Sequence, residues 1–149
     1  MIDWPRVLEL ARTLPAVEPS YSYGTPALKL RNKLIARLRE DGKTLVVRAD
    51  IDDRDVLIAT EPDKFFLTPQ YQAHPWVLVR LSRVDAEELR ELLTDAWRLR
   101  APRRLAARLD ETGEHGVSSR GLRDRVRRVV GRAAAGSGRP AGRRRDDRA

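Results

Sequence analysis

The stretch ALKLRNKLIARLREDGKTLVVRAD, residues 27–50, decides the fold. Apolar and polar residues alternate along it, which is the period of a β-strand with one buried face. Turn-forming residues interrupt this alternation at Asn32 and at Asp41–Gly42, and an Asp-Gly pair is typical of a tight hairpin turn. The stretch therefore predicts three antiparallel strands, over residues 27–31, 33–39 and 44–50.

Helical patterns lie on both sides of these strands. In residues 3–14, apolar side chains recur three and four positions apart, Asp3 can cap the first turn, and proline is tolerated early in a helix. In residues 85–99, Asp85 and Glu88 form a capping box ahead of one apolar face. We expect a helix over each range.

The segment between these helices and strands completes the predicted order. Residues 52–60 suit a short helix that is capped by Asp52 or Asp53. Residues 64–68 and 76–81 are short apolar runs typical of strands. The order α-β-β-β-α-β-β-α predicts an α+β fold, a two-layer α/β sandwich with an antiparallel sheet of about five strands.

Composition narrows the class of protein. The 149 residues include no cysteine, which excludes disulfides, thiolate nucleophiles and cysteine-ligated zinc. No apolar run approaches the roughly 20 residues of a membrane-spanning helix. The first ten residues lack the basic flank and apolar stretch of a signal peptide. We therefore expect a soluble cytoplasmic protein with no membrane partner.

The net charge of +8 is confined to the last third of the chain. Residues 1–102 hold 16 basic and 16 acidic residues, whereas residues 103–149 hold 14 basic and 6 acidic residues. This shift predicts a folded domain over 1–102 and a basic, arginine-rich extension over 103–149.

The extension has its own pattern. Residues 103–110 can continue a helix, and residues 119–130 place apolar side chains on one stripe of a basic amphipathic helix. The Gly/Pro/Arg-rich end is typical of a disordered tail. Its arginines, above all Arg123, Arg127 and Arg128, can bind a polyanion through counterion release.

No group of residues in the sequence predicts catalysis. His74 has no evident base or orienting partner, so we interpret it, with Tyr71 and Trp76, as part of a turn that leads into a strand. His115 lies in a predicted linker. No serine stands in a nucleophile-elbow pattern, and the lone Gly24-Thr25-Pro26 turn is not a phosphate-binding loop. The sequence therefore predicts a non-enzymatic protein without cofactor.

The acidic run at residues 50–61 raises the question of calcium. Arg54 and Asp55 stand where a calcium-binding loop needs a ligand and a glycine. Acids at this place are typical of a helix N-terminus, where they complement the helix dipole. We predict no metal site.

Seven cations in the region of the first hairpin are the strongest binding signal: Lys29, Arg31, Lys33, Arg37, Arg39, Lys43 and Arg48. Because side chains alternate along a strand, Lys33, Ile35, Arg37 and Arg39 are predicted to share one cationic face, opposite Leu34, Ala36 and Leu38. Such a hairpin can follow a phosphate backbone. The same charges can also serve as a solvated face.

Several landmarks resemble the MmcQ/YjbR family. They are Gly24, Thr25 and Pro26 before the first hairpin, Lys33 and Ala36 within it, and Tyr71 and Trp76 around the late turn. The resemblance runs from about the first helix to Pro102. It implies a two-layer α/β fold that is similar to secretion chaperones and to a phage double-wing DNA-binding domain. The family's DNA-binding label rests largely on that similarity of shape.

Two hypotheses follow from different classes of function. In the first, the hairpin acts as a wing and the extension as an anchor on double-stranded DNA. In the second, the domain is a protein-interaction module, and a sheet face or edge takes a partner's segment or a second copy of the chain. We favour DNA binding, because two separate basic features and the resemblance agree.

Overall fold

The computed structural model describes residues 1–112, with side chains through Arg108. Its elements, in chain order, are α1 (Trp4–Ala11), β1 (Val17–Ser22), β2 (Thr25–Leu30), β3 (Lys33–Leu38), β4 (Thr44–Arg48), α2 (Ile51–Thr60), β5 (Phe65–Phe66), the 3-10 turn η1 (Pro69–Tyr71), β6 (Trp76–Arg80), α3 (Ala86–Arg100) and α4 (Arg103–Thr112). Within this range, every helix is too short or too polar to cross a bilayer.

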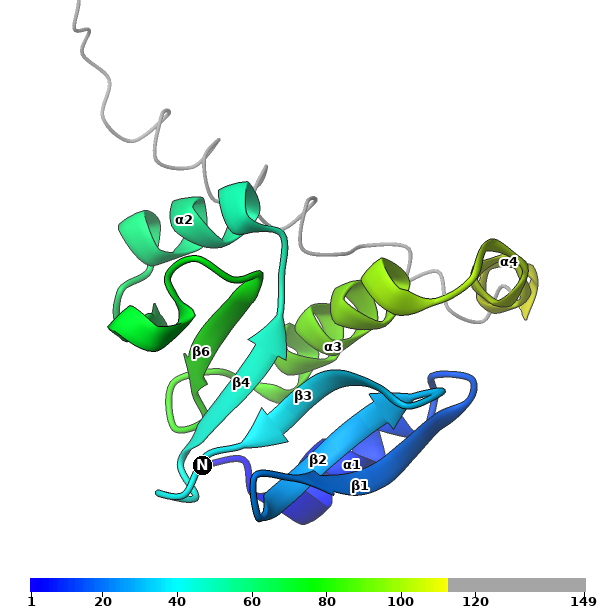
Figure 1. Ribbon diagram of the computed structural model, residues 1–149, viewed down its shortest axis with the longest axis horizontal. Helices are drawn as coiled ribbons and strands as arrows, with labels where there is room; N and C mark the ends of the chain where they lie inside the picture. Colours follow the sequence, from blue (N-terminus) through cyan, green and yellow to red (C-terminus); the bar gives the residue numbers. More distant parts are fainter. Residues whose placement is uncertain (113–149) are drawn as a thin grey trace, which may run out of the picture.

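The strands form one antiparallel sheet in the order β1-β2-β3-β4-β6-β5. Helices α1 and α3 lie behind this sheet in Figure 1, which leaves its front face open. The α+β class and the two layers are therefore confirmed. The sheet has six strands instead of about five, because β1 was not predicted. Its sequence VEPSYS carries a proline, which a sheet tolerates at an edge.

The first three strand connections are tight turns. Tyr23 and Gly24 join β1 to β2 with φ of 53° and 79°, and Arg31 and Asn32 join β2 to β3 with φ of 50° and 71°. Two successive positive φ values are typical of the type I′ turn, whose twist suits a hairpin. Between β3 and β4, Asp41 accepts hydrogen bonds from the backbone N–H of Lys43 and of Thr44 (2.8 and 3.0 Å). The predicted hairpins are thus confirmed.

A bulge in β3 changes which side chains share a face. Leu28 pairs with Ala36 and Lys29 with Leu34, so Ile35 is an extra residue without a partner on β2. Ile35 and Ala36 are both buried in the hydrophobic core. The predicted face of Lys33, Ile35, Arg37 and Arg39 is therefore wrong, because strict alternation stops at the bulge.

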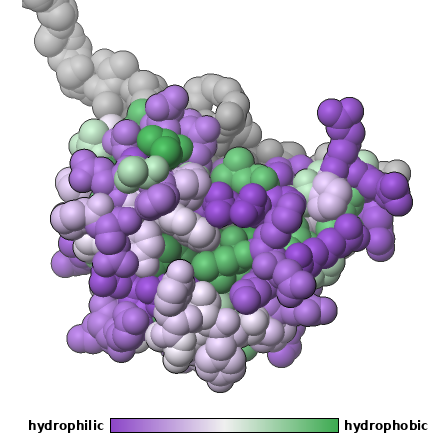
Figure 2. Space-filling view, in the orientation of Figure 1, coloured by the Kyte–Doolittle hydropathy of each residue, from purple (hydrophilic) through white to green (hydrophobic). Residues whose placement is uncertain are grey.

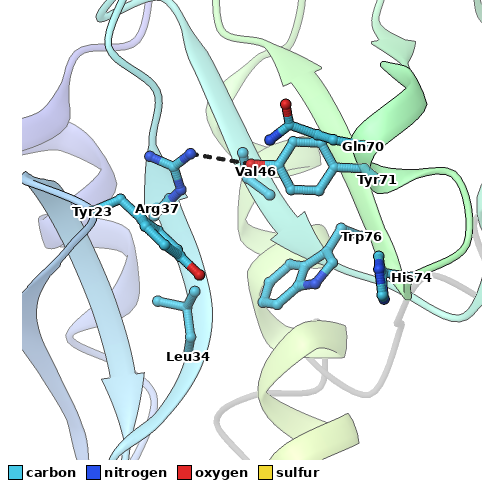
Figure 3. A pocket seen from close by; sticks show the side chains of 8 residues that line it. All are labelled: Tyr23, Leu34, Arg37, Val46, Gln70, Tyr71, His74 and Trp76. Carbon is cyan, nitrogen blue, oxygen red and sulfur yellow. Dashed lines mark hydrogen bonds between the residues drawn. The ribbon is translucent and has the colours of Figure 1, made fainter.

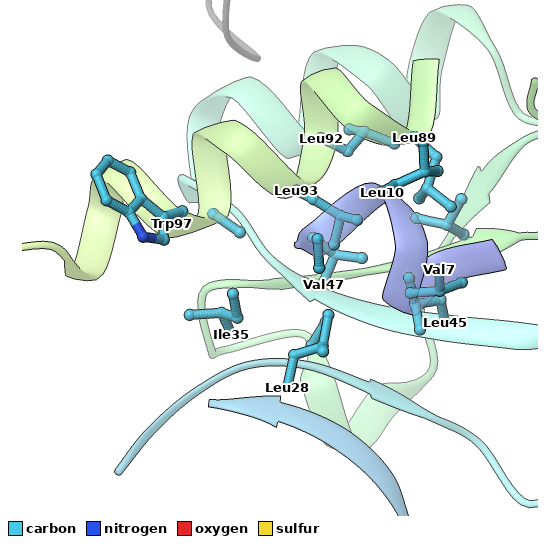
Figure 4. Close-up of a cluster of buried hydrophobic side chains, with 14 of the residues drawn as sticks. Val7, Leu10, Leu28, Ile35, Leu45, Val47, Leu89, Leu92, Leu93 and Trp97 are labelled. Atoms are coloured by element: carbon cyan, nitrogen blue, oxygen red, sulfur yellow. The ribbon is translucent and has the colours of Figure 1, made fainter. Parts of the chain in front are cut away.

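The core lies between the sheet and the two helices behind it (Figure 4). Leu45 and Val47 of β4 belong to this cluster with Leu93 and Trp97 of α3, and all four are buried. The Trp97 indole Nε1–H donates to the backbone carbonyl of Pro15 at 2.8 Å. This bond satisfies a polar group that burial would otherwise leave without a partner.

Side chains cap the N-termini of α3 and α2. The capping box of α3 is present, with Glu88 N–H donating to the Asp85 carboxylate at 2.8 Å and Asp85 N–H donating to the Glu88 carboxylate at 3.0 Å. Helix α2 begins after Asp50, not after Asp52 or Asp53 as predicted. The Asp50 carboxylate accepts from both of their N–H groups and so caps the first turn.

Helix α4 lies in the range that we assigned to the extension, and it places Leu105 in the core cluster. The folded part therefore continues past Pro102. The basic helix that we predicted over 119–130 and the tail beyond it lie outside the described residues.

Candidate functional site

A cavity of about 420 Å³ opens on the face of the sheet that the helices leave uncovered (Figure 3). We call it the aromatic hollow, and its lining residues are Tyr23, Leu34, Arg37, Val46, Gln70, Tyr71, His74 and Trp76. Figure 2 shows hydrophobic surface across the middle of this face, bordered by hydrophilic residues. The hollow combines aromatic rings with one buried cation.

That cation is Arg37, which is only 6% exposed. Its guanidinium donates to the hydroxyls of Thr25 (2.9 Å) and Tyr71 (3.1 Å) and lies 5.2 Å from the centre of the Tyr23 ring. Its nearest carboxylate among the described residues is that of Glu40, at 3.8 Å, and the Glu40 side chain is 66% exposed. Neutral groups therefore make the short hydrogen bonds to the buried charge, and its one ion pair, with Glu40, is long and largely exposed to water.

A second buried arginine shapes the rim of the hollow. Arg54, on α2, is 2% exposed and donates hydrogen bonds to the backbone carbonyls of His74 (2.7 Å), Gln72 (3.1 Å) and Trp76 (3.2 Å). These bonds fix the segment that carries Tyr71 and Trp76 into the hollow. The sequence signal for this role is weak, since it is one cation within an acidic helix start.

Other arginines on the open face are stacked on aromatic rings. The Arg48 guanidinium lies 4.5 Å from the centre of the Trp76 ring, and that of Arg80 lies 4.2 Å from the centre of the Phe66 ring. Stacking of this kind favours the cation and holds the ring in place. Arg48 thus helps to hold the Trp76 ring in place.

A second candidate region lies where the β2–β3 turn meets α4. We call it the arginine groove; it has a volume of about 700 Å³ and is lined by Arg31, Pro102, Arg103, Arg104, Leu105, Ala107 and Arg108. Four of these seven residues are arginines, and none is acidic. The groove is therefore a concentrated positive surface at one end of the sheet.

Positive charge continues from the groove toward β4. Burial lowers the pKa of Arg48, and the positive charge of nearby Arg100, in the last turn of α3, lowers it further. The buried Nε–H of each of these two arginines has no hydrogen-bond partner within the described part of the chain.

The structure separates the seven cations predicted around the first hairpin. Arg31, Lys33 and Lys43 are exposed, while Lys29, Arg39 and Arg48 are half-buried. Arg31 and Lys33 lie at the β2–β3 end of the hairpin, and Arg39 and Lys43 lie at the other end, roughly 20 Å away for a six-residue strand. The seven cations therefore do not form one surface along the described hairpin.

The predicted position of Arg37 is wrong. We expected it on an exposed cationic face, but it is buried beneath Tyr23 and Tyr71 because the bulge turns it into the hollow. Arg123, Arg127 and Arg128 lie outside the described residues.

The segment around His74 is both a structural turn and part of the lining of the aromatic hollow. It forms η1 and a turn that leads into β6, which confirms the predicted scaffold. However, Tyr71, His74 and Trp76 also line the hollow, to which sequence reasoning assigned no chemistry. In residues 1–112, no three His, Asp or Glu side chains are grouped so that they could hold a metal ion.

Comparisons with known proteins place this geometry in a family. Curated relatives include uncharacterised proteins of Mycobacterium tuberculosis and Mycobacterium bovis, which are 41% identical over 63 residues, 40% of this chain and 49% of the relative. The match thus spans about half the length of those relatives. The crystal structure of Deinococcus radiodurans protein DR2400, with a DUF419 domain, is similar in fold, with a TM-score of 0.54 and 20% identity over 68% of this chain and 83% of that chain.

The family model described as YjbR matches residues 12–99, which include all six strands and most of α3. This range covers more than half of the chain and contains the landmarks Gly24, Tyr71 and Trp76. The chain belongs to the YjbR family.

Proposed function

We propose that this chain is a non-enzymatic DNA-binding protein that holds the phosphate backbone of double-stranded DNA in the arginine groove. The observation that carries the proposal is the meeting of Arg31 with Arg103, Arg104 and Arg108 around one cavity without an acidic lining residue. Arginine suits phosphate because its planar donors can form two parallel hydrogen bonds.

The neighbouring pair Arg48 and Arg100 supports the proposal only through its charge. Burial and then the positive charge of Arg100 lower the pKa of Arg48, so positive potential extends from the end of α3. Arg123, Arg127 and Arg128 of the extension would add contacts that do not depend on DNA sequence.

The proposed DNA contact surface is therefore not the face of the hairpin that the sequence predicted. Arg37 is occupied in the hollow, and Arg39 and Lys43 lie at the far end of β3. Of the exposed hairpin cations, Arg31 and Lys33 lie at the end where α4 contributes its arginines. We therefore propose that DNA meets the β2–β3 turn together with α4, not the length of the strands.

The alternative, a protein-interaction module that extends its sheet with a partner's strand, receives less support. The edge strand β1 contains Pro19, and the other edge, β5, has only two residues. Both features are unfavourable for pairing with an added strand.

Fluorescence anisotropy with a short duplex tests the proposal on the full chain, at low and at physiological salt. One variant removes three charges from the groove (Arg31→Gln, Arg104→Gln, Arg108→Gln). The matched control removes three charges from the opposite end of the sheet (Arg39→Gln, Lys43→Gln, Arg83→Gln). The groove variant should bind at least about tenfold more weakly and reduce the slope of log affinity against log salt by about 2 to 3.

A third variant, with Arg123, Arg127 and Arg128 changed to glutamine, separates the groove from the extension. If the groove variant matches the wild type in both affinity and salt slope while this third variant abolishes binding, the groove is not a DNA surface. Equal losses in the groove variant and in its control would indicate only a response to net charge, and would also reject the proposal.

A further inference from the structure

We propose that the aromatic hollow binds a small aromatic carboxylate, with its carboxylate on Arg37 and its ring between Tyr23 and Trp76. The site is separate from the arginine groove, since the two share no lining residue. This inference therefore does not depend on DNA binding.

The anionic part of the ligand follows from the charge balance at Arg37. A buried guanidinium ordinarily has a close carboxylate partner, because burying an unpaired charge is costly. Here the groups within hydrogen-bonding distance are two hydroxyls and the Leu38 carbonyl, all of them neutral. Glu40, at 3.8 Å, remains largely in water. A carboxylate entering the hollow would give Arg37 the short, buried ion pair that the exposed Glu40 does not provide.

The flat part of the ligand follows from the walls. Tyr23 and Leu34 stand on one side of the hollow, and Tyr71 and Trp76 stand on the other (Figure 3). Aromatic rings bind flat, apolar groups by stacking and by edge contacts. The cavity of about 420 Å³ lies within the range of small-molecule sites, roughly 300–1,000 Å³.

Tyr23 provides the least expected feature of these walls. It is 82% exposed and has φ of 53°, a left-handed conformation that is rare for a bulky aromatic residue. Glycine or asparagine would fit this turn position with less strain. The type I′ turn accounts for this φ value, and it places the exposed ring of Tyr23 over Arg37, where it would cover a ligand bound to the guanidinium.

The opposite wall is fixed before any ligand arrives. Arg54 holds the carbonyls of Gln72, His74 and Trp76, and the hydroxyl of Tyr71 accepts a hydrogen bond from Arg37. Arg48 is stacked on Trp76. Such preorganisation lowers the cost of ordering the site when a ligand binds.

The test compares two probes that differ only in charge, 2-naphthoate and 2-naphthylmethanol. Each is titrated into the full-length protein, and the indole N–H signal of Trp76 is followed by NMR and assigned with Trp76→Phe. We expect naphthoate to shift this signal saturably and to bind at least about tenfold more tightly than the alcohol, because only the carboxylate pairs with Arg37.

Two exposed tyrosines provide matched variants. Tyr23→Ala removes a wall of the hollow and should weaken naphthoate binding about tenfold. Tyr21→Ala removes a ring that is 70% exposed two residues earlier, outside the hollow, and should leave binding unchanged. Arg37→Met should abolish the preference for the charged probe. If that variant does not fold, the tyrosine pair still decides the result.

Several outcomes would overturn the proposal. They are the absence of a saturable shift at millimolar naphthoate, equal affinity for both probes, and equal losses from Tyr21→Ala and Tyr23→Ala. Loss of naphthoate binding in the variant of Arg31, Arg104 and Arg108 would place the probe in the groove instead. A Trp76 signal that responds to a single-stranded oligonucleotide but not to naphthoate would make the hollow a nucleobase site and reject the carboxylate.

Discussion

The two faces of the sheet are built from alternate residues of the same strands, yet they differ in kind. On β4, Leu45 and Val47 face the helices, whereas Val46 lies in the aromatic hollow and Arg48 is stacked on a tryptophan. The covered face is apolar and closed. The open face consists of aromatic rings and arginines around a cavity (Figures 2 and 3).

The difference shows that one short strand, β4, contributes to stability through one face and to the candidate binding site through the other. The covered face contributes apolar burial, which is the main stabilising term in folding. The open face instead keeps charged side chains in partly dry surroundings, where their interactions are stronger than in water. Substitutions on the covered face should therefore lower stability, and substitutions on the open face should mainly alter binding.

The strongest test of this contrast uses one leucine from each side. Leu93 of α3 is fully buried, whereas Leu34 of β3 is half-buried at the hollow. Leu93→Ala should lower the free energy of unfolding by about 3 kcal/mol, because it leaves a cavity in the core. Leu34→Ala should lower it by about 1 kcal/mol, since the hollow is already open. Urea unfolding measures both, and equal losses would contradict the contrast between the faces.

Arg54 tests the contrast in a second way, because it is a buried charge whose hydrogen bonds hold the rim of the aromatic hollow. Arg54→Met removes the donors for three backbone carbonyls, and we expect a loss of about 2 kcal/mol in stability. The Trp76 indole signal should broaden or move, because its segment loses its support. Arg54→Lys, which keeps the charge but not the fork of donors, should recover only part of both effects. An unchanged Trp76 signal in Arg54→Met would show that the rim is held by other contacts.

The sequence predicted the covered face better than the open one, and β3 shows why. Hydrophobic periodicity reports where apolar residues recur, so the helices, the hairpin turns and most strands could be read from it. A bulge adds one residue through pairing with a neighbouring strand, and no local pattern in KLIARLR marks it. Arg37 was consequently assigned to solvent, although the bulge turns it into the hollow.

The aromatic hollow was missed for a similar reason. Tyr23, Arg37 and Trp76 come from a turn, a strand and the start of another strand, separated by up to 53 positions in sequence. The pairing of β3 with β2, and of β4 with both β3 and β6, brings them together. Their role as a site is a property of the sheet order, which a single sequence does not specify.

Asp41 provides the smallest and most specific test, because its turn joins two strands that contribute to both faces. Burial raises the pKa of its carboxyl, but hydrogen bonds from Lys43 and Thr44 and the charge of Arg39 outweigh this effect, so the pKa lies below its ordinary value of 3.8. The ionised carboxylate therefore stabilises the fold above pH 3.8, and this contribution is lost as the pH falls through the lowered pKa.

Asp41→Asn should therefore lower the free energy of unfolding by about 1 kcal/mol at neutral pH, because the turn loses charge-assisted hydrogen bonds that are partly exposed to water. The difference from the wild type should shrink once the pH drops below 3.8. Asp63→Asn, which changes an exposed acid in another turn, is the matched control and should have a smaller effect at neutral pH. The Trp76 signal should stay in place, since the turn lies at the end of the sheet and borders neither the core nor the hollow. A shifted Trp76 signal, or a difference between the two proteins that does not change with pH, would mean that Asp41 acts through the open face and not through its turn.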